Sequence, residues 1–202
     1  MLAYLQDGHH LESWLGHRNR ARQYDFMNTA FILWQDQGRP SVSMPFISEL
    51  NFYAAHHLSL APGIYRNQIS YNVKVGKHIP PEHDDVPRHM ADFMAKLSEL
   101  YRTSLPITLA AYALWRLNWI HPFPQGNGRT SRALCYFLLC QRYDKWFPGK
   151  PLVELIRDNR QEYCDLLTEA DGTLTSEGMA DLQKIEAFLV RLMQVQIASV
   201  QP

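Results

Sequence analysis

Apolar residues recur at helical spacing along most of the chain, which predicts a mainly helical fold. The first such pattern covers residues 11–37 and ends where Gly38 and Pro40 favour helix termination. The same periodicity predicts further helices from about residue 43 to 58, after Val86-Pro87, and over residues 107–120, 132–143, 152–167 and 182–195. The segments 107–120 and 132–143 are apolar on nearly all sides, which indicates that these two helices lie at the centre of the core.

Residues 65–75 depart from the helical pattern. Tyr71 and Val73 alternate with polar neighbours, which is the period of a β-strand, and Pro-Gly and Pro-Pro pairs bound the segment. The pattern predicts a short strand or hairpin within a helical chain. Because an isolated hairpin is only marginally stable, we expect it to lie against the helices or to receive a partner strand.

The composition fits one globular domain. The chain has 202 residues, of which 46% are hydrophobic and 20% charged, and this excludes a disordered protein. Twenty Lys and Arg balance twenty Asp and Glu, so no basic excess favours binding to nucleic acid or to an anionic membrane, and we expect neither as a partner. Arg18, Arg20 and Arg22 in the first predicted helix are interpreted as a solvated face rather than a partner-binding face.

The cysteines and the termini bear on location. Three cysteines without Cys-x-x-Cys spacing indicate reduced thiols and neither a disulfide framework nor a zinc site. The first ten residues contain no apolar stretch of the kind found in a signal peptide. The most apolar segment, residues 107–120, is interrupted by Arg116 and Asn118 and is shorter than the roughly 20 residues that span a bilayer. We therefore expect a cytoplasmic protein, or an effector that acts in a host cytosol.

The segment between the two most apolar helices contains the residues suited to chemistry. Pro122 and Pro124 end the first helix directly after His121. Gly126 and Gly128 permit a left-handed backbone and the close approach of a ligand. The turn then leads into the next helix.

These residue types together predict a phosphate site beside a base. A glycine-rich turn at a helix N-terminus presents N–H groups to an anion. Arg129 and Arg132, one turn apart, add planar donors suited to phosphate. A histidine with an ordinary pKa of about 6.5 can accept a proton near neutral pH. Each residue alone is more often structural, but their concentration here favours transfer of a phosphate-containing group to a nucleophile that loses a proton.

The stretch His121-Pro-Phe-x-x-Gly126-Asn127-Gly128-Arg129-x-x-Arg132 resembles the signature of the Fic domain family, His-Pro-Phe-x-(Asp/Glu)-Gly-Asn-Gly-Arg-x-x-Arg, at every specified position but one. Pro62-Gly63-Ile64-Tyr65-Arg66 is similar to the family's Gly-x-Tyr-Arg entry to a β-hairpin flap, and Asn159-Arg160 with Tyr163 is similar to a later family stretch. The resemblance covers about residues 45–195.

The resemblance implies an all-α fold of the Fic type, a helical bundle with a small β-hairpin flap at about residues 62–80. The active-site loop would be residues 121–132. A Fic domain over residues 41–202 would follow an N-terminal helical extension over residues 1–40, and the two would form one compact unit.

The resemblance also implies an activity, the transfer of AMP from ATP to a Ser, Thr or Tyr hydroxyl of a target protein. His121 would take the proton from that hydroxyl. The nucleotide-binding residues would be Gly126, Asn127, Gly128 and Arg129 at the α- and β-phosphates and Arg132 at the γ-phosphate. The flap would dock the target by adding a strand, through Tyr65, Arg66, Tyr71 and Val73.

Gln125 stands where the family pattern has Asp or Glu, the carboxylate that binds Mg²⁺ in the family. A neutral amide oxygen offers Mg²⁺ one negative charge fewer, so we expect weakly held Mg²⁺ and slower transfer. Two alternatives stay open: transfer of another phosphate-containing group, and a module that binds nucleotide or a partner protein without transfer.

A second short pattern suggests regulation. Residues 173–178 match the family's inhibitory (Ser/Thr)-x-x-x-Glu-(Gly/Asn) motif, in which the Glu pairs with the second arginine. This implies that Glu177 inhibits the protein through Arg132. The alternative is that Glu177 only favours the start of the following helix. An antitoxin chain or self-association is then the implied source of inhibition.

Overall fold

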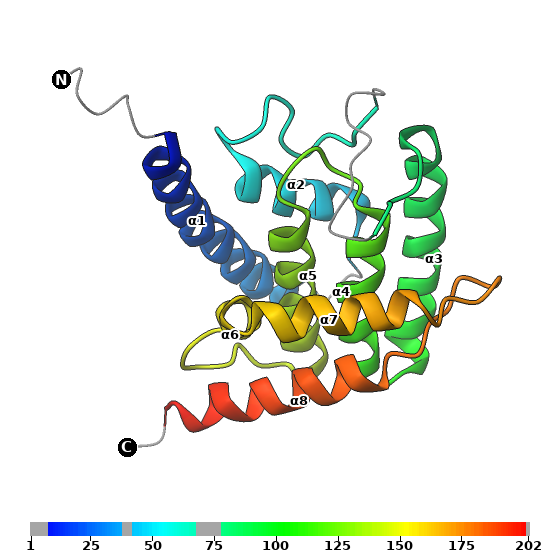
Figure 1. Cartoon of the computed structure of the whole chain (residues 1–202). Helices are drawn as coiled ribbons and strands as arrows, with labels where there is room; N and C mark the ends of the chain where they lie inside the picture. The colour runs from blue at the N-terminus through cyan, green and yellow to red at the C-terminus, as the bar shows by residue number, and fades with distance from the viewer. Residues whose placement is uncertain (1–7, 38–41, 68–77, 201–202) are drawn as a thin grey trace.

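The computed structural model describes residues 8–37, 42–67 and 78–200, and helices dominate these ranges (Figure 1). They are α1 (Gly8–Asp36), α2 (Met44–Ala55), the 3₁₀-helix η3 (His83–Asp85), α3 (Val86–Thr103), α4 (Pro106–Ile120), α5 (Asn127–Tyr143), α6 (Leu152–Asp158), α7 (Arg160–Asp171) and α8 (Gln183–Ala198). No strand occurs within these three ranges. The predicted strand positions Tyr71 and Val73 lie outside them. The all-α class is confirmed for the part of the chain that is described.

The two most apolar helices form the centre of the bundle, as their sequence predicted (Figure 1). Every residue of α4 from Leu109 to Leu117 is buried, and α5 is buried from Ala133 to Gln141. Both helices therefore have neighbours on all sides. The loop that joins them is held at one end of this core.

The N-terminal helix α1 packs on α2 and α5. The buried amide of Asn19 donates a hydrogen bond to the carbonyl of His56 at 2.7 Å, and Gln23 Nε2 donates to the carbonyl of Leu50 at 2.7 Å. These bonds satisfy polar groups inside the contact, which would otherwise destabilise it. Helix α1 is thus joined to the elements that hold the loop.

Two helix boundaries differ from the sequence prediction. Helix α5 begins at Asn127, five residues earlier than the apolar pattern indicated, because Thr130 and Ser131 are buried through hydrogen bonds to Gly126 and Gly128 rather than through apolar contact. The helix predicted over residues 152–167 is divided at Asn159, whose side chain donates to the carbonyl of Leu155 at 2.8 Å.

All three cysteines are free in the described structure. Cys135 and Cys140 are buried and Cys164 is exposed. Among the described helices, none combines the length and the apolar character needed to cross a bilayer.

Candidate active site

His121 ends α4 in a left-handed conformation, with φ 50° and ψ 56°. Its ring Nδ1 lies 3.3 Å from the carbonyl oxygen of Asn118. Because a carbonyl can only accept, Nδ1 carries the hydrogen and Nε2 keeps its lone pair. Burial is the main cause that lowers the His121 pKa to about 4, and Arg66 and His78 lower it further. The imidazole is therefore neutral at physiological pH and can accept a proton at Nε2.

Arg66 holds the backbone at this point. Its side chain is 1% exposed and donates to the carbonyls of His121 at 2.7 Å, Ile120 at 3.1 Å and Pro81 at 2.6 Å. The last carbonyls of a helix lack partners within the helix, and a cation is favourable there. The Arg66 side chain is therefore buried against the end of α4, and its expected role in target docking stays a prediction.

Tyr65 also faces the interior. Its ring packs on Phe123 with centroids 5.3 Å apart, and its hydroxyl donates to Met44 Sδ at 3.3 Å. Burial raises the Tyr65 pKa to about 12. Tyr65 therefore supports the buried Phe123 at the base of the loop.

The side chain of Asn127 bonds to the loop that precedes it. Its Oδ1 accepts from the N–H of Phe123 at 2.9 Å, and its Nδ2 donates to the carbonyl of Phe123 at 2.7 Å. Both ends of the amide are used in this way, and the residue is 2% exposed. The Asn127 side chain is therefore not available to bind a phosphate, and only its backbone N–H could make the expected contact.

Asn51 of α2 joins the loop from the other side. Its Nδ2 donates to the carbonyl of Gln125 at 2.8 Å, and its Oδ1 accepts from the N–H of Gly63 at 2.9 Å. Gly126 has φ +82°, and a Cβ at this position would lie 3.0 Å from Asn51 Nδ2. Glycine is required here both for conformation and for space.

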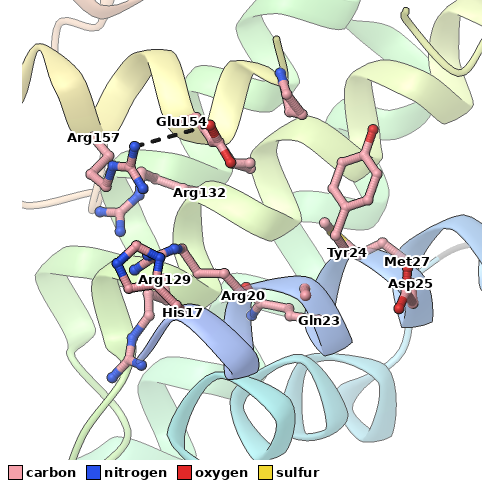
Figure 2. Close-up of a pocket in the computed structure, with 13 residues that line it drawn as sticks. His17, Arg20, Gln23, Tyr24, Asp25, Met27, Arg129, Arg132, Glu154 and Arg157 are labelled. Carbon is pink, nitrogen blue, oxygen red and sulfur yellow. Dashed lines mark hydrogen bonds and ion pairs between the residues drawn. The ribbon is translucent and has the colours of Figure 1, made fainter. Parts of the chain in front are cut away.

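Beside the first turn of α5, a cavity of about 470 Å³ opens between α1 and α6 (Figure 2). Arg129 and Arg132 line it together with Arg20 of α1 and Arg157 of α6. His121 and the Gly126–Gly128 turn are not among its lining residues. The guanidinium of Arg132 lies between the cavity and the turn. Its Nη1 is so near Gly128 that a Cβ on that glycine would lie 3.2 Å from it.

The charges in this cavity are poorly balanced. Burial lowers the pKa of Arg129, and the positive charges of Arg132 and Arg20 lower it further. Within the described ranges no ion pair reaches these three arginines. The cluster therefore favours an anion with several oxygens, since each guanidinium can donate two hydrogen bonds.

A model of the Fic/DOC family matches residues 46–139. This match includes Arg66, the whole loop, and Arg129 and Arg132 of α5. This segment of the chain is a Fic/DOC domain. Its Fic domain match ends before α6 and begins after α1, so Arg20 and Arg157 lie outside it.

Named relatives match the Fic segment in part. The protein adenylyltransferase Fic of Drosophila persimilis is 39% identical over 107 residues, which is 52% of this chain and 19% of the relative. The protein adenylyltransferase Fic of Nematostella vectensis is 31% identical over 151 residues, which is 72% of this chain and 32% of the relative. The chain thus spans between about a fifth and a third of the length of these relatives.

Solved structures share the Fic fold. A Fic-domain signaling protein from Bacteroides thetaiotaomicron superposes with a TM-score of 0.72 and 22% identity, over 94% of this chain and 73% of that one. Fic-1 from C. elegans, residues 134–508, gives a TM-score of 0.63 and 24% identity, over 91% of this chain and 52% of that one. At 22% and 24% sequence identity, these two superpositions establish the fold of this chain and nothing further.

Arg20 is a cavity residue that sequence reasoning did not identify. The face expected to be solvated has Arg18 and Arg22 exposed, and the half-buried Arg20 lines the cavity, with its Nη2 2.5 Å from His17 Nδ1. The signal was a three-residue spacing that puts His17 and Arg20 on one helix face. Spacing alone does not reveal which face of α1 meets the Fic domain.

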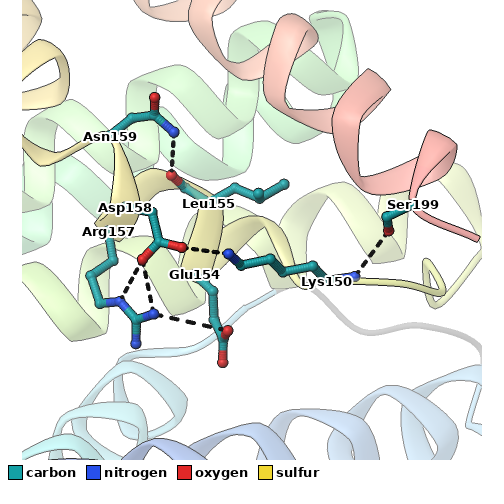
Figure 3. A network of polar contacts seen from close by, with 7 residues as sticks. All are labelled: Lys150, Glu154, Leu155, Arg157, Asp158, Asn159 and Ser199. Atoms are coloured by element: carbon teal, nitrogen blue, oxygen red, sulfur yellow. Dashed lines mark hydrogen bonds and ion pairs between the residues drawn. The ribbon is translucent and has the colours of Figure 1, made fainter.

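Arg157 is fixed by a surface network (Figure 3). Its Nε and Nη2 donate to Asp158 Oδ1 at 3.0 and 2.9 Å, and Lys150 Nζ lies 2.6 Å from Asp158 Oδ2. These hydrogen bonds lower the Asp158 pKa. Arg157 is thereby held in position and partly neutralised, in contrast to the three arginines opposite it.

The residues around Gln125 offer few ligands for Mg²⁺. Gln125 is exposed and neutral, and its backbone carbonyl already accepts from Asn51. Within the described ranges no group of three His, Cys, Asp or Glu residues gathers as metal ligands. These residues fit a tightly held Mg²⁺ poorly, since magnesium prefers charged oxygens.

Glu177 does not meet the second arginine of the Fic loop. It is exposed in the turn after α7 and lines a different cavity, which it shares with Arg88 and Arg116. No ion pair joins Glu177 to Arg132 in the part of the chain that is described. The inhibitory contact expected from the motif is therefore not formed in this structure.

The lowered His121 pKa predicts a pH-dependent stability. Between the folded value of about 4 and the unfolded value of about 6.5, only the unfolded chain binds this proton. The free energy of unfolding should therefore fall as pH drops through this window, by up to about 3 kcal/mol. Urea unfolding at pH 7 and pH 4.5 tests this. His121→Gln should lose less stability than the wild type, while the exposed His57→Gln should keep the full slope. Equal slopes in His121→Gln and wild type would refute the assignment.

Proposed function

We propose that this Fic protein is an enzyme that transfers AMP from ATP to a Ser, Thr or Tyr hydroxyl of a target protein. The observation that carries the proposal is a neutral, buried imidazole at one end of a fixed loop and a cationic cavity at the other. The names of the curated relatives support the same reaction class. We place the reaction in the cytosol, where ATP is available.

The residues suggest how the reaction proceeds. The target hydroxyl oxygen attacks the α-phosphorus of ATP while its proton passes to Nε2 of His121. The bond from the α-phosphorus to the bridging oxygen of the β-phosphate breaks, and pyrophosphate leaves. The N–H groups at the start of α5 and the guanidinium of Arg129 stabilise the charge on the phosphates. In this way the base and the phosphate site act on opposite sides of one phosphorus.

The cavity then receives the far end of the nucleotide. Arg132 reaches over Gly128 and would contact the γ-phosphate, and Arg20 lies among the same cations. A triphosphate carries enough oxygens to serve all three unpaired arginines. The cavity therefore suits ATP better than a nucleoside monophosphate.

Mg²⁺ is proposed to accompany ATP and to be weakly held. Gln125→Glu should add a charged ligand, lower the Mg²⁺ concentration needed for half-maximal transfer and raise the rate several-fold. Label incorporation from ATP across a Mg²⁺ titration measures both quantities. Gln125→Asn, which keeps the position neutral, should show no gain. If the Glu variant gains nothing either, Gln125 is not at the metal position.

Intact-mass measurement tests the proposed function. The protein is incubated with ATP, UTP, CTP and GTP in turn, with and without a cell extract as a source of targets. An added AMP group on this chain or on a target supports the proposal. A different added group, or nucleotide binding without any added mass, would favour one of the two alternatives. The second of these, a binding module, is favoured by the neutral Gln125.

Inhibition is proposed to come from outside the cavity's own residues. Glu177 lies elsewhere, so a separate antitoxin chain or a second copy of this chain would supply a carboxylate to Arg132. Gel filtration with and without ATP tests self-association. An acidic partner should compete with ATP for the arginine cluster.

A further inference from the structure

A groove of about 560 Å³ lies between α2 and the turn that follows it. Most of its lining is aromatic, prolyl or aliphatic, and the residues that give it this character are Pro45, Phe52, Tyr53, Pro62 and Ile64. Phe52 is 39% exposed and Ile64 is 59% exposed, so the groove presents apolar surface to solvent. It shares no lining residue with the cavity that contains Arg129 and Arg132.

The turn is fixed on α2, so the groove is preformed. Gly63 has φ +79°, and a Cβ on this residue would lie 2.8 Å from the carbonyl oxygen of Ser48. The N–H of Gly63 donates to Asn51 Oδ1 at 2.9 Å, and the N–H of Ile64 donates to the carbonyl of Ala61 at 3.3 Å. A partner that binds here therefore has little of the groove to order.

Three polar side chains of the groove have no partner within the described residues: Ser48, Glu49 and Tyr53. Glu49 is exposed, and it is the only charged residue found in the lining of the groove in this part of the structure. Ser48 and Tyr53 are half-buried, but their hydroxyls are not among the buried atoms that lack a partner, so both reach solvent. The groove thus offers two free hydroxyl donors and one free carboxylate.

The backbone of the groove restricts how a peptide can bind. Pro45 and Pro62 have no N–H, and the N–H groups of Gly63 and Ile64 are already bonded. A β-strand added at this groove would therefore find no free backbone donors along these residues. A helix satisfies its own backbone groups and would leave both hydroxyl donors unused.

A polyproline II segment uses all of these groups. Its backbone has no internal hydrogen bonds, so its carbonyls can accept from the hydroxyls of Ser48 and Tyr53. Its proline rings pack on aromatic surface such as that of Phe52 and Tyr53. The carboxylate of Glu49 favours a cation beside the prolines, because a charge-assisted hydrogen bond is stronger than a neutral one.

We infer that this groove binds a basic, proline-rich segment of a partner protein, with the prolines on its aromatic wall and an Arg or Lys at Glu49. The groove lies beside the candidate active site, because the Asn51 side chain that accepts from the turn also donates to the loop. This inference does not depend on the proposed transfer of AMP.

Fluorescence polarisation with a fluorescein-labelled peptide tests the inference on the full chain, without nucleotide. The probe is Arg-Ala-Leu-Pro-Pro-Leu-Pro, and two matched peptides carry Glu in place of Arg or Ala in place of each Pro. We expect the Arg peptide to bind. The Glu peptide should bind at least about tenfold more weakly, because it meets a like charge. The Ala peptide should bind several-fold more weakly, because it is not preorganised.

Charge reversal in the groove provides the sharpest comparison. Glu49→Lys should reverse the preference, so that the Glu peptide binds more tightly than the Arg peptide. Glu12→Lys makes the same charge change at an exposed position of α1 outside the groove and should leave the preference unchanged. Phe52→Ala should weaken binding of the Arg peptide several-fold. If circular dichroism shows that Phe52→Ala is not folded, the reversal in Glu49→Lys still decides.

Equal affinity for the three peptides, no binding at millimolar peptide, or an unchanged preference in Glu49→Lys would overturn the inference. Gel filtration tests a different occupant. A wild type that is a dimer and a Glu49→Lys variant that is a monomer would assign the groove to a second copy of this chain, and would also overturn the inference. Because the binding test contains no nucleotide, its failure would leave the proposed AMP transfer unaffected.

Discussion

Replacing His121 with glutamine is expected to reduce the proposed AMP transfer by a factor of about 10² to 10⁴, the usual contribution of a general base. Glutamine retains a donor for the carbonyl of Asn118, so the loop should keep its conformation. It offers no basic nitrogen for the hydroxyl proton. Label incorporation from ATP gives the rate, and calorimetry gives the ATP affinity.

The two measurements separate a chemical role from a structural one. ATP affinity should stay within about twofold of the wild type, a change of under 0.5 kcal/mol. His57→Gln, at an exposed position with a left-handed backbone, is the matched control and should transfer normally. If ATP affinity falls by the same factor as the rate, His121 serves to bind the nucleotide rather than to accept a proton.

Replacing Arg66 with methionine is expected to destabilise the fold by about 3–5 kcal/mol, because a buried charged donor is removed and its acceptors stay buried. The carbonyls of Ile120, His121 and Pro81 would lose their partner. His121 would also lose the bond that fixes its backbone, so transfer should fall even under conditions where the protein is folded.

Urea unfolding measures the stability of this variant. Arg102→Met is the control, since Arg102 is exposed and donates only to Ser98 Oγ, at 3.1 Å, among the bonds described. It should change the free energy of unfolding by no more than about 0.5 kcal/mol. A similarly small change in Arg66→Met would show that the buried guanidinium is not needed to hold the end of α4.

The sequence predicted the centre of the fold better than its polar contacts. Helices α4 and α5 were identified because apolar residues surround them, and periodicity records that directly. The apolar pattern alone placed the start of α5 too late, because Thr130 and Ser131 are buried by hydrogen bonds, which leave no such pattern, whereas the glycine-rich turn predicted a helix directly after it. The division between α6 and α7 was missed for a similar reason, since one amide at Asn159 determines it.

In the candidate site, too, the local pattern was predicted and the long-range contacts were not. Local spacing was sufficient to bring together His121, Arg129 and Arg132 as candidates, because one loop and one helical turn contain all three. It could not find Arg20, whose neighbours in the cavity lie far along the chain. Nor could it place Arg66, because a charged residue is expected at the surface and this one is buried.

The walls of the arginine cavity come from α1 and α6 as well as from α5, so the segment that matches the family does not contain the whole cavity. A fragment cut at the limits of the family match would keep the loop, Arg66, and Arg129 and Arg132 of α5. It would lack α1 and α6, and with them two of the four guanidinium groups of the cavity and the two surfaces that enclose it. Such a truncation would retain the loop but expose Arg129 and Arg132 to bulk water, so the cationic cavity needs more of the chain than the matched segment.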